Sequence, residues 1–203
     1  MTKQERAGRT RRLLIDSAAV EFARRGYVGT SLNKICTAAM ATVGALTFHF
    51  PAKSTLAEAV CAQGAELTRK AVAEASGAAD SPLRGVVDVT QALAGLLDTE
   101  PAVQAAARLT REQRDIRADW YDAWFPTVRD LLDRAHQMGQ LRGDGAPQAV
   151  MALVGCLVAG FEGAAMRVDY VPPGGGSWSP KGQLDAMWDV ILPGVVTPPG
   201  TSL

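Results

Sequence analysis

The sequence of 203 residues contains few of the side chains that covalent or metal chemistry requires. Its only histidines are His49 and His136, and its only cysteines are Cys36, Cys61 and Cys156. No Cys/His pair, Ser-His-Asp set, glycine-rich phosphate loop or carboxylate cluster occurs at a spacing that active sites use. An odd number of cysteines without metal-ligand spacing is typical of a reducing cytosol. We therefore expect no catalytic residues, no metal and no cofactor.

The sequence also lacks a long uninterrupted apolar run. It begins Met-Thr-Lys-Gln-Glu-Arg, without the apolar segment of a signal peptide. Its most apolar stretch, residues 150–166, contains Glu162 and several glycines, and is predicted to be too short and too polar to span a bilayer. These features predict a soluble, cytoplasmic protein without a membrane partner.

The net charge is zero, because 21 Lys and Arg residues balance 21 Asp and Glu residues. The charges are unevenly distributed, however. Residues 1–53 contain nine Lys or Arg and three Asp or Glu, a net charge of +6, so the remainder carries −6. A basic amino-terminal segment followed by an acidic remainder indicates a module that binds phosphates, although a solvated amino-terminal face would show the same charges.

All the long segments have the periodicity of helices. Within residues 9–25, Leu14, Ala18 and Phe22 fall on one stripe, and Gly26 is placed to end the helix. No segment shows the sustained alternation of a strand, and there are no internal repeats, so the fold class is predicted to be all-α. Later helices are expected over residues 52–75, 82–97, 101–110, 120–138, 147–168 and 181–196, with a linker at 76–81.

Residues 30–56 are the most informative part of the chain. They are predicted to form two short helices joined by a tight turn, followed by an aromatic-rich exit into the next helix. Thr30 or Ser31 can cap the first of these helices, and Thr42 can cap the second, which should end near His49. With the arginine-rich helix before them, they predict a three-helix module of the helix-turn-helix type that binds DNA in the major groove.

Motifs along nearly the whole chain carry a family resemblance. Over residues 9–60 they are Gly26-Tyr27, Thr30-Ser31-Leu32, Ile35, Gly44-Ala45-Leu46, Phe48-His49-Phe50-Pro51, Lys53 and Leu56. Further along they are Ala106-Ala107-Arg108-Leu109, Trp124, and Gly139-Gln140-Leu141-Arg142 before Pro147. The chain resembles the TetR family of transcriptional repressors, and within it the γ-butyrolactone receptor branch. The resemblance implies a repressor that binds double-stranded, palindromic operator DNA at the nucleoid.

The resemblance also implies two domains in each chain of a homodimer. A helix-turn-helix DNA-binding domain is expected at residues 8–68, and a ligand-binding and dimerisation domain at 69–203. One reading helix contacts only a half-site, so two-fold symmetry doubles the contacts with DNA. The last two helices are expected to pair with their symmetry mates as a four-helix bundle through Met151, Val154, Leu157, Val158, Phe161, Leu184, Met187, Trp188 and Ile191.

The expected DNA contacts fall into two groups. Those in or at the edge of the major groove are Thr42, Val43, Ala45 and Thr47. Those that anchor the DNA backbone are Arg11, Thr30, Lys34, His49 and Lys53. Ser31 and Gly44 are also assigned to the interface. His49 could instead be a helix-end residue packed beside Phe48, and both Phe48 and Phe50 are expected in the core.

The module departs from the family pattern at three positions. Met40 stands in the turn where relatives usually have glycine, so a positive φ there would cost about 1–2 kcal/mol. Val43 and Thr47 replace a common lysine and tyrosine, which removes a phosphate contact and adds methyl groups that can touch thymine. These departures leave an alternative open: a small-molecule-binding or protein-interacting pseudo-receptor with weak or altered DNA binding.

The effector site is implied by the resemblance alone. The effector would be a γ-butyrolactone, butenolide or furan that releases the repressor from secondary-metabolite genes. Such an amphiphile needs an apolar slot and one or two polar contacts. Trp124 fits a pocket wall or ordinary core packing, Gln63 is the expected polar contact, and Ala159-Gly160 stands where relatives often have a polar ligand contact. The rest of the expected lining is Leu93, Leu97, Leu109, Val154 and Val158.

Overall fold

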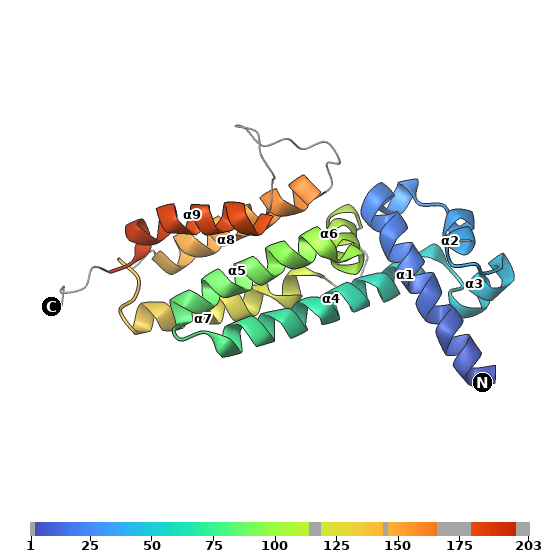
Figure 1. The fold of residues 1–203 in the computed structure, drawn as a ribbon, viewed down its shortest axis with the longest axis horizontal. Helices are drawn as coiled ribbons and strands as arrows, with labels where there is room; N and C mark the ends of the chain where they lie inside the picture. The colour runs from blue at the N-terminus through green and yellow to red at the C-terminus, as the bar shows by residue number, and fades with distance from the viewer. Residues whose placement is uncertain (1–2, 114–118, 144–145, 166–179, 198–203) are drawn as a thin grey trace. The chain divides into compact units, whose positions relative to one another are not determined.

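The computed structural model describes residues 3–113, 119–143, 146–165 and 180–197, and it is built from helices (Figure 1). They are α1 (Lys3–Gly29), α2 (Leu32–Ala38), α3 (Val43–His49), α4 (Lys53–Ala78), α5 (Pro82–Thr99), α6 (Pro101–Glu112), the 3-10 turn η1 (Tyr121–Ala123), α7 (Phe125–Gln137), α8 (Ala146–Ala165) and α9 (Pro180–Val195). Within these ranges, β pairing is limited to an isolated bridge between Leu141 and Val196. The prediction of an all-α fold is confirmed.

The chain folds into two compact units. The first contains Met1–Leu67 and Glu100–Ala123, and the second contains Thr68–Thr99 and Trp124–Leu203. Helix α4 therefore begins in the first unit and ends in the second, and α6 belongs to the first unit. The division at residue 68 into a DNA-binding and a ligand-binding domain stays a prediction.

Helix α1 is anchored by the apolar stripe that the sequence indicates. The side chains of Leu14, Ala18 and Phe22 are completely buried. The helix begins earlier than expected, at Lys3, and is broken at Gly26, where φ is 68° and ψ is −176°. Glycine adopts a positive φ without the steric cost that a Cβ brings. The expected interruption at Gly26 is therefore confirmed as a kink, after which the helix resumes briefly.

Helices α4 and α6 approach each other closely in the first unit. Gly64 of α4 lies against the backbone of Ala102, and a Cβ at Gly64 would be 2.6 Å from the Cβ of Ala106. This glycine is required by the close approach of the two helices rather than by its backbone dihedrals. Helix α6 also packs along α1, and its Val103 and Leu109 are completely buried.

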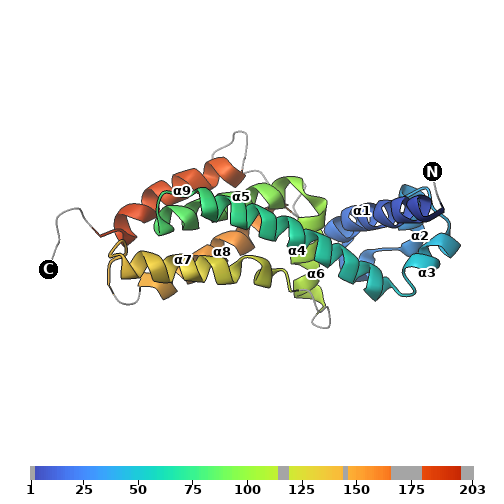
Figure 2. The ribbon, with the colours of Figure 1, turned by 90° about the horizontal axis from the view of Figure 1, so that it is seen from below.

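In the second unit, α5 packs against α7, α8 and α9 (Figure 2). Leu93 and Leu97 of α5 are at most 1% exposed. The Nε1–H of Trp188 in α9 donates a hydrogen bond of 2.9 Å to the buried hydroxyl of Thr90 in α5. Because a buried indole N–H needs an acceptor, this contact fixes α9 in one register on α5.

Part of the predicted dimer surface lies inside the chain's own core. Five of the nine side chains assigned to the four-helix bundle are buried in the single chain, namely Val154, Val158, Phe161, Leu184 and Trp188. The prediction that these five face a partner was wrong. The reason is that α8 and α9 are apolar on more than one face, so a list of apolar residues does not separate the face packed on α5 from the outer face.

The start of α7 also differs from the prediction. The helix expected from Trp120 begins at Phe125, and residues 121–123 form the 3-10 turn. Pro126 gives the reason, because proline lacks an N–H and is tolerated in the first turn of a helix but not in its interior. Trp124 is the N-cap, with a φ of −138°.

Two other expected boundaries concern α4 and α8. The linker expected at residues 76–81 is shorter, because α4 continues to Ala78. The end of the helix expected at residues 147–168 lies outside the described part of the chain.

Helix α8 contains an apolar segment, Ala146–Gly163, of 18 residues with a mean hydropathy of 1.4. This length and composition are sufficient to cross a membrane, so the prediction that the stretch is too short was wrong. A single such helix is weak evidence for a span, because core helices pass the same test. Val150, Val154 and Val158 of α8 are at most 1% exposed and pack in the second unit.

Candidate nucleic-acid interface

Helix α3 is capped as the sequence predicts. The Thr42 hydroxyl oxygen accepts a hydrogen bond of 3.1 Å from the N–H of Ala45, which satisfies an amide that the helix itself leaves unpaired. The hydroxyl of Thr47 donates to the carbonyl oxygens of Val43 (3.0 Å) and Gly44 (3.2 Å). Since its hydrogen is committed inside the helix, Thr47 offers a partner its methyl group and an oxygen lone pair.

Opposite faces of α3 have opposite character. Leu46 and Phe50 are 1% and 3% exposed, whereas Val43 and Phe48 are 52% and 80% exposed. The prediction that Phe48 belongs to the core was wrong, and the same prediction for Phe50 is confirmed. Helical periodicity gives the reason, because Phe48 lies two residues after Leu46 in the helix and so points away from it. The outer face of α3 therefore carries apolar side chains that the folded chain leaves open.

The turn between α2 and α3 is centred on Met40. Its φ is 50°, and its side chain is 91% exposed. Its N–H donates to the carbonyl of Thr37 at 3.2 Å, and the N–H of Ala41 donates to the carbonyl of Cys36 at 2.9 Å. Among the described residues, Met40 alone combines a side chain with a positive φ, so the strain expected from the missing glycine is present.

Basic and aromatic side chains lie near both ends of the helix-turn-helix. The guanidinium of Arg11 lies 5.3 Å from the centroid of the Phe50 ring, a cation–π contact. Lys34 is exposed on α2. The half-buried ring of His49 lies 5.1 Å from that of Phe48 and 6.4 Å from that of Phe50, between centroids. The aromatic packing considered for His49 is thus present, and its phosphate contact stays a prediction.

Lys53 and Thr30 are engaged with each other inside the module. The Nζ of Lys53 donates to the carbonyl of Thr30 at 2.6 Å and lies 4.7 Å from the centroid of the Tyr27 ring. Burial lowers the pKa of Lys53. The Thr30 side chain is 5% exposed, and its hydroxyl donates to the carbonyls of Glu21 and Gly26. DNA contacts by Thr30 and Lys53 stay predictions. Each residue would have to contact DNA while keeping these internal hydrogen bonds.

Two small residues complete the predicted interface. Ser31 is the N-cap of α2, and its side chain makes no capping hydrogen bond. A Cβ at Gly44 would meet only the Thr42 hydroxyl oxygen, at the ordinary distance of 3.9 Å. Packing therefore does not require a glycine at position 44, and its effect is to keep the first turn of α3 free of side-chain bulk.

The residues predicted to bind an effector are divided between the two units. Five belong to the second unit and are at most 1% exposed: Trp124, Leu93, Leu97, Val154 and Val158. Gln63 and Leu109 belong to the first unit. The Nε2 of Gln63 donates to the carboxylate of Asp16 at 3.1 Å, and Leu109 is completely buried. Their assembly into one pocket stays a prediction.

A groove of about 580 Å³ lies between α7 and α8 in the second unit. It is lined by Phe125, Arg129, Leu132, Asp133, Pro147, Gln148, Met151, Ala152 and Gly155. Its volume is within the range of small-molecule sites. The groove lining and the predicted effector residues share no member. In the described ranges, no group of three or more His, Cys, Asp or Glu is placed to hold a metal ion.

Comparison with known sequences finds relatives over nearly the whole chain. Residues 14–60 match the family described as bacterial regulatory proteins, tetR family. The A-factor receptor protein of Streptomyces griseus is 33% identical over 204 residues, which covers 98% of this chain and 68% of that protein.

Solved structures with the same fold include two close in length. A crystal structure of a γ-butyrolactone receptor (ArpA-like protein) has a TM-score of 0.76 and 28% identity, covering 95% of this chain and 90% of that one. The TetR family protein CprB of Streptomyces coelicolor, in complex with its biological operator sequence, has a TM-score of 0.72 and 27% identity, with the same coverage of 95% and 90%.

Proposed function

The chain belongs to the TetR family of bacterial regulatory proteins, and we propose that it is a ligand-responsive repressor that binds palindromic operator DNA as a homodimer. The family is one of regulators rather than enzymes. The observation that carries the proposal is the two-sided character of α3: Leu46 and the C-cap residue Phe50 are buried, whereas Val43 and Phe48 are exposed. A helix of this kind, second in a helix-turn-helix, is suited to enter the major groove. The protein would act in the cytoplasm, at the nucleoid.

The open face of α3 suggests how bases are contacted. The methyl groups of Val43 and Thr47 and the ring of Phe48 offer apolar surface, which suits the methyl group of thymine. Phe48 was absent from the contacts predicted from the sequence and is added here because of its exposure. Arg11 and Lys34 are exposed and supply cations for the flanking phosphates.

Replacing Lys34 with alanine tests the DNA contacts. Lys34→Ala is expected to weaken binding to all duplexes about equally and to lower the slope of log K against log salt by about one. Fluorescence anisotropy would measure this on a duplex that the parent protein enriches from a randomised library. Lys70→Ala is the matched control, because Lys70 lies in the second unit and pairs with Glu74 at 3.9 Å. An unchanged slope for Lys34→Ala would remove Lys34 from the interface.

For the homodimer, we propose an interface through the outer faces of α8 and α9. These faces carry exposed small or apolar residues: Ala152, Cys156, Ala159, Gly160, Ala186, Met187 and Val190. Small side chains allow helices from two chains to pack closely around a two-fold axis. The burial of Val154 and Trp188 against α5 leaves these outer residues as the available apolar surface.

Sedimentation tests this interface. The parent is expected to sediment as a dimer, and Ala159→Arg as a monomer that binds the enriched duplex more weakly, because a buried unpaired guanidinium opposes association. Ala73→Arg, an equal change at an exposed position of α4, is expected to remain dimeric. A dimeric Ala159→Arg protein would place the interface elsewhere.

We propose that the effector is a γ-butyrolactone, butenolide or furan and that the controlled genes make secondary metabolites. The support is the resemblance to an A-factor receptor and to a γ-butyrolactone receptor. The alternative is a pseudo-receptor with weak or altered DNA binding, which the strained Met40 and the substituted Val43 and Thr47 favour.

Titration of a γ-butyrolactone, a butenolide and a furan separates these two functions. The repressor is expected to release the enriched duplex as tryptophan fluorescence changes, because the ligand must favour the state that does not bind DNA. Duplex binding with no release by any of the three compounds would contradict the effector class and leave the DNA-binding function. Failure to enrich any duplex would favour the pseudo-receptor.

A further inference from the structure

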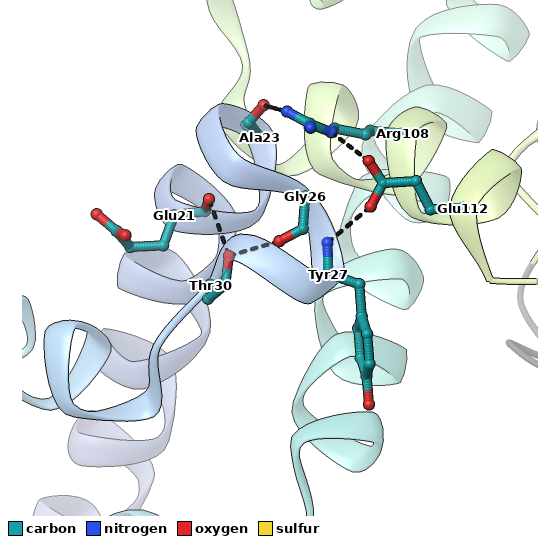
Figure 3. Close-up of polar contacts among 7 residues, drawn as sticks. All are labelled: Glu21, Ala23, Gly26, Tyr27, Thr30, Arg108 and Glu112. Carbon is teal, nitrogen blue, oxygen red and sulfur yellow. Dashed lines mark hydrogen bonds and ion pairs between the residues drawn. The ribbon is translucent and has the colours of Figure 1, made fainter.

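The carbonyl groups near the end of α1 are held by side chains (Figure 3). The hydroxyl of Thr30 donates to the carbonyls of Glu21 (3.1 Å) and Gly26 (2.7 Å). The Nη1 of Arg108 in α6 donates to the carbonyl of Ala23 at 3.0 Å. Helix ends leave carbonyls without intrahelical partners, and a cation there also complements the helix dipole. The kink in α1 is therefore capped from a distant part of the chain.

Arg108 and Glu112, one turn apart on α6, bridge the kink (Figure 3). The Nε of Arg108 donates to Oε1 of Glu112 at 2.6 Å, and Oε2 of Glu112 accepts the N–H of Tyr27 at 2.7 Å. The guanidinium holds the turn before Gly26, and the carboxylate holds the first amide after it. The two side chains are 22% and 33% exposed, so solvent screens them less than a fully exposed pair.

The ion pair leaves no room for a side chain at Gly26. A Cβ at Gly26 would clash with the carboxylate of Glu112 and lie 2.8 Å from the guanidinium of Arg108. The φ of 68° is a separate reason for glycine at this position. The close approach of α6 and the kink in α1 therefore depend on each other.

The segment after the kink also contacts the start of α4. The Tyr27 ring lies 4.7 Å from the Nζ of Lys53, and the same Nζ donates to the carbonyl of Thr30 at 2.6 Å. Lys53 is the first residue of α4, which follows α3 after a short connection. Residues 26–30 thus make direct contacts both with the ion pair of α6 and with the helix that follows α3.

We propose that Arg108 and Glu112 are positioning residues for DNA binding. The pair fixes how α6 seats on residues 26–30, and this seating sets the position of Lys53 and hence the orientation of α3. The inference rests on the proposed function, because its readout is binding to operator-like DNA. In this role neither side chain needs to touch DNA. Removing either side chain therefore lowers the affinity for DNA without removing a phosphate contact.

The test uses the full chain and the duplex that the parent enriches from a randomised library. Arg108→Ala and Glu112→Ala are each expected to weaken binding about tenfold. The slope of log K against log salt should stay unchanged, because no phosphate contact is lost. The variant with both alanines should bind the duplex as tightly as the single variant of lower affinity, since each change alone already breaks the bridge between Arg108 and Glu112. Glu112→Gln should show a smaller loss than Glu112→Ala, because its single amide oxygen can accept the Tyr27 N–H or the Arg108 Nε–H but no longer both.

Arg84→Ala is the matched control. Arg84 forms an ion pair of the same type, with Asp88 one helical turn later at 2.9 Å, but on α5 in the second unit. The control variant should bind the duplex as the parent does. Hydrogen exchange in the DNA-free protein should show a less protected Tyr27 amide in Glu112→Ala and not in Arg84→Ala. If an alanine variant does not fold, Arg108→Gln, which removes the charge with less loss of packing, should show the same tenfold loss, about 1.4 kcal/mol.

The outcomes separate this inference from the function on which it rests. Parental affinity in Arg108→Ala and Glu112→Ala, a lowered salt slope, or an equal loss in Arg84→Ala would overturn the positioning role and leave the repressor function intact. A parent protein that enriches no duplex would overturn the proposed function and the positioning role together.

Discussion

At the scale of single residues, Met40 is the position where the backbone of the DNA-binding module is most strained. Its φ of 50° brings its Cβ close to the backbone, at a cost of about 1–2 kcal/mol. Its side chain is 91% exposed and therefore gains little from burial. The rest of the module must offset this cost, through buried residues such as Leu46 and Phe50.

Met40→Gly is expected to raise the free energy of unfolding by about 1 kcal/mol, because glycine accepts a positive φ without a Cβ penalty. Urea denaturation would measure the change. Met138→Gly is the matched control, since Met138 is also exposed but has a φ of −83°. The control is expected to lose stability, because glycine gains nothing there and adds entropy to the unfolded chain. A similar gain in both variants would show that φ is not the cause.

Cys61 makes the stability depend on pH. Its thiol is completely buried in α4, and burial, with a smaller contribution from the charge of Glu58, raises its pKa from 9.0 to about 12. Above pH 9 the unfolded chain loses this proton while the folded chain keeps it, so the unfolded state binds fewer protons. The stability is thus complete below pH 9 and falls by about 1.4 kcal/mol per pH unit as the pH rises toward 12.

Urea denaturation between about pH 8 and pH 11 would test this dependence. Cys61→Ala is expected to be less stable at neutral pH, because of the cavity, but to lose less stability as the pH rises. If the parent and Cys61→Ala declined in parallel, the Cys61 thiol would not be the group responsible.

At the scale of elements, local signals predicted the reading helix well. The cap at Thr42 and the apolar spacing of Leu46 and Phe50 are features of neighbouring residues, and the structure contains both. The misplacement of Phe48 was avoidable, because the same spacing puts it on the opposite face. The bridge from Glu112 to Tyr27 was not predictable, since these residues are 85 positions apart and Arg108–Glu112 resembles an ordinary surface pair in sequence.

The junction of α1 and α6 can be tested at Gly26. Gly26→Ala is expected to destabilise the protein by more than the roughly 1–2 kcal/mol of a positive φ, because its Cβ also displaces Glu112 and Arg108. Gly139→Ala separates the two costs, since Gly139 has a φ of 69° and no atom within 4 Å of its Cβ position. Urea denaturation of both variants gives the difference. Equal losses would mean that Glu112 and Arg108 move aside without cost.

At the scale of the whole molecule, the distribution of charge along the sequence points to the DNA-binding module, whereas no comparable feature of the sequence locates the effector site. Residues 1–53 carry +6 and the remainder −6, which directs the amino-terminal module toward phosphates while the net charge stays zero. The predicted effector residues Leu93, Leu97 and Val154 are buried apolar side chains. Core packing and ligand binding require the same residue types at such positions, so sequence alone does not separate the two roles.

As a homodimer, the protein is expected to bind an inverted repeat, with one reading helix in each half-site. The most direct measurement compares binding of the parent to the enriched palindromic duplex and to the same duplex with one half-site scrambled, over a range of salt concentrations. We expect two chains on the palindrome, much weaker binding to the scrambled duplex, and a log K that falls linearly with log salt by about 0.9 per phosphate contact. Equal affinity for both duplexes, or binding that does not respond to salt, would contradict this expectation.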